Sequence, residues 1–153
     1  MKNILVLITL AICTLSCSAQ QSDTSSDVLN HEQLREKLTK QEAYVLLDNG
    51  TERPFTGEYD KHFEDGIYKC VGCANPLYSS ETKYDSGSGW PAFWAPIEGN
   101  VAYTKDRSHG MVRTEVHCAK CGGHLGHVFN DGPKNETGKR HCINSVVLEF
   151  VED

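Results

Sequence analysis

The fold class that the sequence predicts is mainly β: a small, mostly antiparallel domain with short N-terminal helices and a structural metal site. Three observations predict it. Short β-type runs alternate with glycine-rich turns through the C-terminal part of the chain. Two helix-capping patterns precede these runs. Two cysteine pairs of the same spacing could hold one metal ion.

The first 17 residues are expected to be a secretory leader. Lys2 supplies a positive charge, and residues 4–15 form an almost unbroken apolar run that is too short to span a bilayer as a stable helix. Cleavage after Ala19, or before Cys17 with a lipid attached to that cysteine, would fit this pattern. The segment resembles a bacterial lipoprotein signal, although Thr14 departs from the usual leucine, and we favour lipidation at Cys17.

The segment of residues 18–27 has no aromatic or large aliphatic side chain, so it is expected to be a flexible tether. Residues 28–153 then form one domain. The protein is expected to be exported by a bacterium, either to the periplasm or to the outer membrane. Membrane contact is expected only through the lipid at Cys17.

Acidic residues outnumber basic ones, and the net charge is −6. Removal of the leader takes away Lys2 and no acidic residue, which leaves −7. Affinity for nucleic acid comes mainly from basic side chains that neutralise phosphates, so we expect no nucleic-acid partner. We expect a monomer.

Two short helices are expected at the start of the domain. Asn30 with Gln33, and Thr39 with Glu42, each match a capping box, in which two side chains satisfy the free N–H groups of a helix start. The second helix is expected to end at residues 49–50, which are Asn-Gly, and Pro54 prevents its restarting.

Strands are expected in the rest of the domain. In residues 111–117, Val112, Thr114 and Val116 alternate with polar side chains, as in a strand with one buried face. Residues 107–110, "RSHG", could form the turn before this run. The expected strands are residues 66–69, 101–105, 111–117 and 145–151.

The two C-x-x-C pairs, Cys70 with Cys73 and Cys118 with Cys121, predict one tetrahedral Zn(II) site. Disulfides are an alternative because the leader implies an oxidising compartment, and redox-active dithiols are a weaker one. Four cysteines would fill the coordination sphere, so this zinc would be structural. Glycines 72, 122 and 123 lie in or beside the two turns, where positive φ angles are expected.

His124 and His127 lie three residues apart in a glycine-containing segment, and Asp131 follows. A second metal site is one interpretation, but the H-E-x-x-H helix that would place two histidines on one face is absent. Two histidines that are merely solvated or hydrogen-bonded are another. Proton transfer is the third.

Cys142 remains after the zinc site has taken four cysteines. A lone cysteine is often a small buried hydrophobe. Here Arg140 and His141 precede it and Asn144 follows, so a cationic and hydrogen-bonding setting is expected to lower the thiol pKa and favour the nucleophilic thiolate. Cys142 is also expected at the entrance to the last strand.

Four motifs occur in order around the two cysteine pairs: "NGTERPFTGEY", "SGSGWPAF", "GHLGHVFNDGP" and "RHCINS". With them, the chain resembles the methionine-R-sulfoxide reductase family from about His31 to the C-terminus. The resemblance implies two small antiparallel sheets and one zinc ion bound by the four cysteines. The implied reaction is reduction of methionine-R-sulfoxide in proteins, in which Cys142 is the nucleophile and becomes a sulfenic acid.

The resemblance also assigns substrate contacts, groups around the sulfoxide oxygen and residues beside the nucleophile. The substrate contacts are Trp90 and Phe129. The groups around the sulfoxide oxygen are His124, His127 and Asp131, and the residues beside the nucleophile are Arg140 and Asn144. A histidine suits the proton donor because its pKa lies near neutral pH, and Asp131 could orient one imidazole. Trp90 would receive the methyl group, whereas Phe93 and Trp94 are expected in the core.

Ser88 stands where some members of this family carry the cysteine that resolves the sulfenic acid. A serine cannot form that disulfide, so an external thiol, such as a thioredoxin-like protein, is expected to reduce Cys142 directly. The alternative function is a non-enzymatic zinc-ribbon module that binds another protein. That reading leaves Cys142, Trp90 and the two histidines unexplained.

Overall fold

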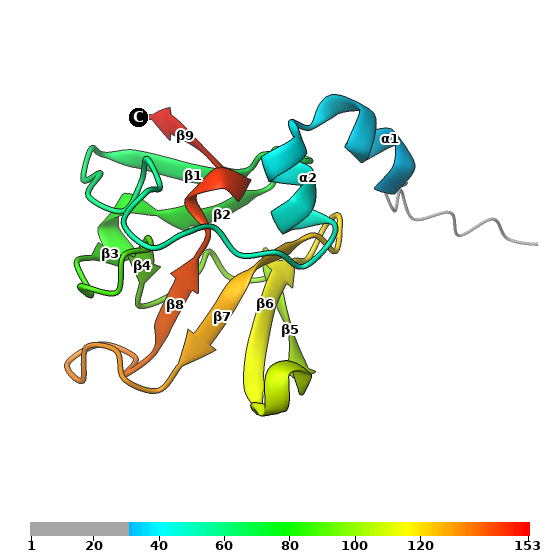
Figure 1. Ribbon diagram of the computed structural model, residues 1–153. Helices are drawn as coiled ribbons and strands as arrows, with labels where there is room; N and C mark the ends of the chain where they lie inside the picture. The colour runs from blue at the N-terminus through cyan, green and yellow to red at the C-terminus, as the bar shows by residue number, and fades with distance from the viewer. Residues whose placement is uncertain (1–30) are drawn as a thin grey trace, which may run out of the picture.

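The computed structural model describes residues 31–153, which form two short helices and two antiparallel sheets (Figure 1). The expected leader, the tether and the capping residue Asn30 lie outside the described residues. In the described part of the chain, no helix is long and apolar enough to cross a membrane.

Helix α1 spans His31–Lys37 and helix α2 spans Lys40–Leu46. The capping box at Thr39 is confirmed: its hydroxyl accepts the N–H of Glu42, and the Glu42 carboxylate accepts the N–H of Thr39 at 2.6 Å. The helix itself ends at Leu46, earlier than expected, and a turn continues to Gly50, whose N–H donates to Tyr44 O.

One sheet has three strands in the order β2-β1-β9. Their bounds are Gly66–Cys70 for β1, Pro76–Ser79 for β2 and Leu148–Glu152 for β9. The C-terminal strand therefore pairs with the first strand of the chain and closes the domain (Figure 1).

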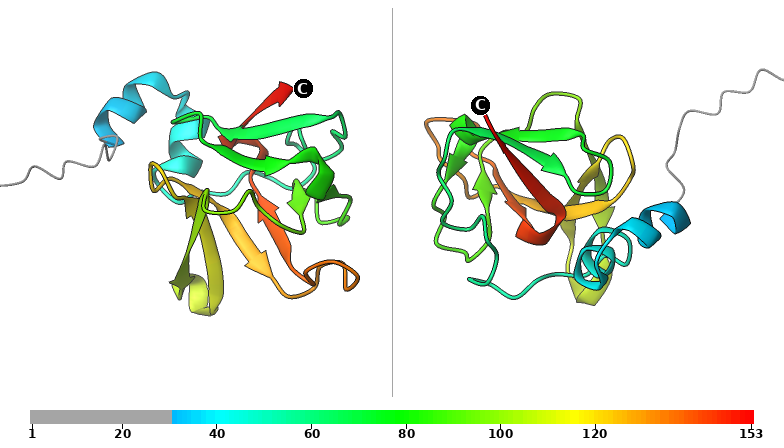
Figure 2. Two further views of the ribbon diagram at one scale, coloured as in Figure 1. Left: turned by 180° about the vertical axis from the view of Figure 1, so that it is seen from behind. Right: turned by 90° about the horizontal axis from the view of Figure 1, so that it is seen from above.

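The other sheet has six strands in the order β3-β4-β8-β7-β6-β5. Their bounds are Lys83–Tyr84, Ala92–Phe93, Val101–Asp106, Arg113–Cys118, His124–Phe129 and Arg140–Ile143 for β3 to β8. Figure 2 shows strands β5 to β8 extending away from the three-stranded sheet. The two antiparallel sheets that the resemblance implied are confirmed.

Two expected strands begin later than the sequence pattern indicated. Strand β6 starts at Arg113, and Val112 is 68% exposed and Thr114 is exposed, whereas Val116 is fully buried. The inward alternation therefore fails at the free end of the β5–β6 hairpin. Residues Ser145–Val147 form a 3₁₀ turn, η3, and β9 begins only at Leu148.

The core is one cluster that receives side chains from both sheets and from α2. Tyr78 of β2 and Phe93 of β4 are fully buried, and their rings stack at 4.3 Å between centroids. Phe93 is thus a core residue, as expected, but Trp94 is only partly buried. Leu46 of α2 packs beside both cysteine turns, and this contact joins the helices to the metal site.

Candidate active site and metal centre

The four paired cysteines gather at one point between the ends of β1 and β6. Their Sγ atoms lie within 4.8 Å of one another. The distances are 3.8 Å between Cys70 and Cys121 and 3.6 Å between Cys73 and Cys118. Tetrahedral zinc with bonds of about 2.3 Å requires sulfur atoms about 3.8 Å apart. The cluster therefore fits one metal ion, and its four ligands leave no position for a substrate.

Cys142 lies within strand β8, directly opposite His127 of β7 and Ala92 of β4. Side chains that face each other in this way across an antiparallel pair lie on one face of the sheet, with Cβ atoms about 5 Å apart. Cys142 is partly exposed and lines a pocket of about 130 Å³. The other lining residues are Thr51, Trp90, Arg113, Gly126, His127, Phe129 and Asn144.

A β-bulge explains how His124 and His127 share one face. Residues three apart in a regular strand point to opposite faces. In β7, His127 pairs with Glu115 and Gly126 with Val116, but His124 pairs with His117, so Leu125 is an extra residue. The bulge reverses the alternation. The two imidazole rings consequently lie 5.5 Å apart between centroids.

Each of these histidines has a carboxylate partner from a neighbouring strand. His127 Nε2 lies 2.9 Å from Asp106 Oδ2, and His124 Nδ1 lies 2.7 Å from Glu115 Oε1. Arg113 also donates to Asp106 Oδ2, at 2.6 Å. The pKa of Asp106 is lowered, mainly by the Ser108 N–H and also by His127 and Arg113, so this carboxylate stays ionised.

His124 differs from His127 in its surroundings. It is 3% exposed and does not line the Cys142 pocket. Burial lowers the pKa of His124, although Glu115 opposes this effect. His124 therefore packs against His127 outside the pocket, and His127 is the histidine that lines it.

The structure places Asp131 with Arg140 and not with an imidazole. Arg140 donates to both carboxylate oxygens of Asp131, at 2.9 and 2.8 Å, and its guanidinium lies 4.5 Å from the ring centroid of Phe129. The expectation that Asp131 orients an imidazole is therefore wrong, because its partner is Arg140. Asp106 and Glu115 fill that position, and Asp131 instead holds Arg140.

Asn144 forms hydrogen bonds with the bulged residue, Leu125. Its backbone N–H and its side-chain Nδ2 both donate to Leu125 O, each at 2.9 Å. Its Oδ1 accepts the N–H of Glu52 at 3.0 Å. Because both donors of Asn144 end on the bulged residue, this side chain fixes the irregularity that brings the histidines together.

A family model described as the SelR domain matches residues 38–152. The chain belongs to the SelR domain family. It is 53% identical over 123 residues to a peptide methionine sulfoxide reductase MsrB of Thioalkalivibrio sulfidiphilus, a match that covers 80% of this chain and 89% of that protein. An MsrB of Pseudomonas syringae is 55% identical over 121 residues, or 78% of this chain and 92% of the other.

A vertebrate relative matches as well. The mitochondrial methionine-R-sulfoxide reductase B3 of Mus musculus is 49% identical over 137 residues, which cover 89% of this chain and 54% of the mouse protein. The family resemblance carried by the four sequence motifs is confirmed by these matches.

In this SelR domain the cysteines are not paired as disulfides. Among residues 31–153 all five cysteines are free, and the four in the cluster are the only group that gathers as metal ligands do. The disulfide interpretation and a second metal site at His124, His127 and Asp131 therefore have no support in the described residues.

Only one of the three turn glycines has the expected backbone angle. Gly122 has a φ of 74°. Gly72 and Gly123 serve a different purpose, since a Cβ atom at either position would lie within 2.7 Å of the Leu46 side chain. These two glycines allow α2 to pack closely on the metal site.

The expected lowering of the Cys142 pKa is wrong for this SelR domain. Burial raises the pKa of the thiol, and Ser88 and Arg140 oppose this only in part. His141 does not offset this rise, because strand alternation turns it to the other face, where it contacts the Tyr78 hydroxyl at 3.1 Å and burial lowers its own pKa. Cys142 also lies inside β8 and not at the entrance to the last strand.

Sequence reasoning missed Asp106, Glu115, Arg113 and Glu52. Their signal in the sequence is weak, because they are common charged residues without metal-ligand or nucleophile spacing. The expected candidate Ser88 does lie at the site: its Oγ is 3.8 Å from Cys142 Sγ. Four of the expected site residues line the same pocket as Cys142: Trp90, Phe129, His127 and Asn144. The other three, His124, Asp131 and Arg140, do not line it.

Proposed function

We propose that this chain reduces methionine-R-sulfoxide in proteins to methionine and that Cys142 is the nucleophile. Membership of the SelR domain family supports the reaction. The observation that carries the assignment of the nucleophile is the position of Cys142. It is the one described cysteine outside the four-sulfur cluster, and it lines a pocket with an indole and an imidazole.

In the first step the Cys142 sulfur attacks the sulfoxide sulfur. The sulfoxide oxygen takes up a proton, and the resulting hydroxyl moves from the substrate sulfur to the Cys142 sulfur as the new bond between the two sulfur atoms breaks. This step leaves a sulfenic acid on Cys142 and releases methionine. The thiol is oxidised by two electrons and the sulfoxide is reduced by two. His127 is the proton donor, because it faces Cys142 across the β7–β8 pair.

Asp106 and Arg113 serve this proton transfer. Since Nε2 of His127 contacts the Asp106 carboxylate, Nδ1 is the ring nitrogen left for the pocket. An ionised carboxylate stabilises the imidazolium form and fixes the ring orientation. His124 and Asn144 act less directly: His124 packs behind His127, and Asn144 holds the bulge.

The substrate methyl group has no polar atom, so shape and aromatic contact must recognise it. Trp90 and Phe129 line the pocket and provide such contact, which is favourable for a polarisable sulfur centre. Arg140 stacks on Phe129 and reduces the pKa rise of the Cys142 thiol, while Asp131 anchors Arg140. The pocket is thus apolar where the methyl binds and charged near the oxygen.

We propose that the four-cysteine cluster holds one structural Zn(II) ion. Four thiolates in tetrahedral arrangement are the ligand set that zinc prefers in such sites, and the sulfur spacing agrees with its bond length. The ion would supply a crosslink between the two sheets. It has no part in the chemistry, since no ligand position is open to a substrate.

Reduction of the sulfenic acid requires another thiol. Ser88 lies beside Cys142 and cannot form a disulfide, so an external dithiol, such as a thioredoxin-like protein, attacks Cys142 directly. The partly exposed position of Cys142 permits this attack. We further propose a monomer that is exported and lipidated at Cys17, on the leader-like sequence of residues 1–17.

Separated epimers of a methionine sulfoxide peptide test the proposed function. With a dithiol reductant, the wild type is expected to reduce the R epimer and leave the S epimer intact, and Cys142→Ser is expected to be inactive. If Cys142→Ser keeps its activity, or if the S epimer is the substrate, the proposal fails. A zinc-ribbon binding module would show no reduction of either epimer.

A further inference from the structure

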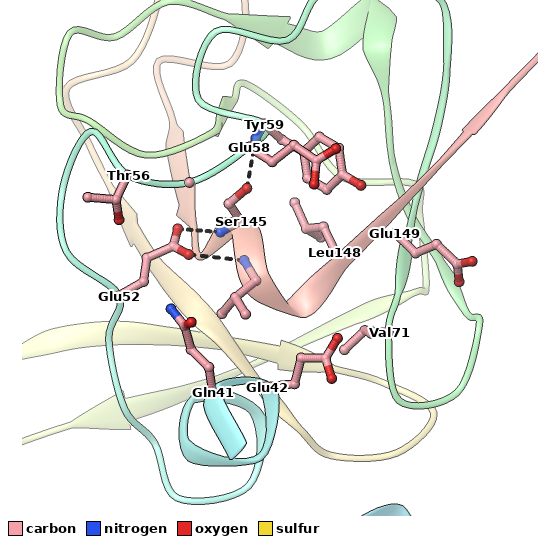
Figure 3. Close-up of a pocket in the computed structure, with 12 residues that line it drawn as sticks. Gln41, Glu42, Glu52, Thr56, Glu58, Tyr59, Val71, Ser145, Leu148 and Glu149 are labelled. Carbon is pink, nitrogen blue, oxygen red and sulfur yellow. Dashed lines mark hydrogen bonds between the residues drawn. The ribbon is translucent and has the colours of Figure 1, made fainter. Parts of the chain in front are cut away.

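Glu52 is a buried carboxylate in the loop between α2 and β1, and only 7% of the residue is exposed. Its carboxylate accepts two backbone N–H groups at the start of η3: that of Ser145 and that of Val146, the latter at 3.0 Å (Figure 3). These residues follow Cys142 closely in the chain. The side chain of Glu52 therefore joins its loop to the segment that leaves the nucleophile strand.

The backbone of Glu52 holds two side chains of the Cys142 pocket. Its N–H donates to Asn144 Oδ1 at 3.0 Å, and its carbonyl accepts the indole N–H of Trp90 at 3.3 Å. Trp90 reaches the pocket from the segment before β4, and Asn144 reaches it from the end of β8. One residue thus sets the positions of both groups relative to each other.

The charge on Glu52 is costly where it lies. Burial raises the pKa of its carboxyl group, and the two N–H donors only oppose that rise. A buried carboxylate is tolerated when hydrogen bonds satisfy its oxygens, and two charge-assisted bonds to adjacent amides hold a fixed geometry. This arrangement is suited to precise placement of a loop.

The loop also approaches η3 very closely. A Cβ atom built on Gly57 would lie 2.4 Å from Ser145 Cβ and 2.9 Å from Glu52 Oε1. Ser145 Oγ accepts the N–H of Tyr59 at 2.7 Å. The loop is therefore attached to η3 on both sides of Gly57, and Glu52 is the attachment nearer to the pocket.

We propose that Glu52 is a positioning residue for sulfoxide binding: its carboxylate seats the loop on η3, and its backbone then fixes Trp90 and Asn144 around the substrate methyl group. The proposal rests on the proposed function. Glu52 itself does not touch the substrate, because its carboxylate is bound by the η3 amides and lines a hollow other than the Cys142 pocket (Figure 3).

The hollow offers a matched control. Glu58 lines the same hollow as Glu52, but its side chain is exposed (Figure 3). No hydrogen bond described for the domain joins Glu58 to Trp90 or Asn144, whereas Glu52 contacts both. Glu58→Gln removes the same charge from the same hollow. A difference between Glu52→Gln and Glu58→Gln would report the attachment to η3 and not the charge.

The experiment compares the full-length wild type, Glu52→Gln and Glu58→Gln, each checked for folding by circular dichroism. Glutamine has one acceptor oxygen, so one η3 N–H loses its partner. We expect KM for the R-sulfoxide peptide to rise about tenfold in Glu52→Gln, with kcat changed less than about threefold, because roughly one hydrogen bond of positioning is lost. Glu58→Gln is expected to match the wild type.

Tryptophan fluorescence gives a second readout without turnover. In a Trp94→Phe background, Trp90 emission is expected to shift to longer wavelength when Glu52→Gln loosens the indole. A folded Glu52→Gln protein with wild-type KM and unshifted emission would overturn the inference. The proposed function would still stand if Cys142→Ser is inactive. Should Glu52→Gln not fold, Glu52→Asp, which keeps the charge but is one methylene shorter, decides by the same two measurements.

Discussion

His127 of β7 and Asp106 at the end of β5 form a direct contact, with Nε2 of the imidazole 2.9 Å from Oδ2 of the carboxylate. Strand β6 lies between β5 and β7 in the sheet, so the contact reaches across β6. Arg113 of β6 donates to the same carboxylate oxygen. The proposed proton donor is thus held by a carboxylate of β5, and that carboxylate is held in turn by an arginine of β6.

Asp106→Asn keeps the size of the side chain but removes its charge. We expect kcat to fall about tenfold or more, because the imidazolium form of His127 loses its anionic partner, and KM to change little. Steady-state kinetics with the R-sulfoxide peptide measures both. Asp48→Asn, which breaks an exposed ion pair with Arg35, is the control. Equal kcat values for the two variants would contradict the role of Asp106.

Ser88→Cys is expected to create a resolving thiol. Ser88 Oγ lies 3.8 Å from Cys142 Sγ, and a small side-chain rotation would bring a sulfur at that position to bonding distance. After one turnover, mass spectrometry should find an intramolecular disulfide at Cys142 in the variant. The wild type should show none. A disulfide at Cys142 in the wild type would instead refute direct reduction by an external thiol.

Loss of one proposed zinc ligand is expected to destabilise the fold and spare the proposed nucleophile. Cys118→Ser should bind less than one zinc per chain and lower Tm by more than about 10 °C, because metal binding contributes directly to folding free energy. Elemental analysis and calorimetry measure these effects. Cys142→Ser is the control and should keep one zinc per chain. A Cys118→Ser protein with unchanged Tm would contradict a structural role for the metal.

Stability is expected to fall in mild acid because of His141. Burial lowers its pKa from 6.5 to about 4, and Lys139 adds to this effect. Between these values the unfolded chain binds a proton that the folded chain does not, so the free energy of unfolding falls as pH falls through this window, by up to roughly 3 kcal/mol.

Chemical denaturation of wild type and His141→Asn between pH 7 and 4 isolates this contribution. The loss on acidification should be smaller in the variant, since other acid-sensitive groups, including the metal site, are common to both. His141 contacts Tyr78 and Tyr103 and not the Cys142 pocket. Parallel pH profiles would show that His141 does not cause the acid sensitivity.

The sequence predicted the chemistry of the site better than its supporting geometry. Cysteine spacing identified the four cysteines that gather as metal ligands do. Once those four are set aside, Cys142 is the remaining thiol of the described residues. The bulge at Leu125 could not be predicted, because it depends on which residue of β6 opposes it. Asp106 and Glu115 reach the histidines only through pairing of strands that are distant in the chain.

The fold shows the same division. Capping and turn patterns located α2, a short β-type run located β5, and one alternating run located most of β6. Strands β3 and β4 are two residues each and carry no periodic pattern of their own. They exist because the neighbouring strand β8 supplies hydrogen-bond partners for β4, which in turn pairs with β3. Glu52 was missed because its importance lies in its tertiary contacts with Trp90, Asn144 and Ser145.

The central claim is that the Cys142 sulfur takes the oxygen from methionine-R-sulfoxide. The most direct measurement is a single turnover without reductant, followed by trapping with dimedone and peptide mapping by mass spectrometry. We expect one methionine per chain and one dimedone adduct, on Cys142. Methionine formed with no adduct on Cys142, or with the adduct on a cysteine of the four-sulfur cluster, would contradict the account.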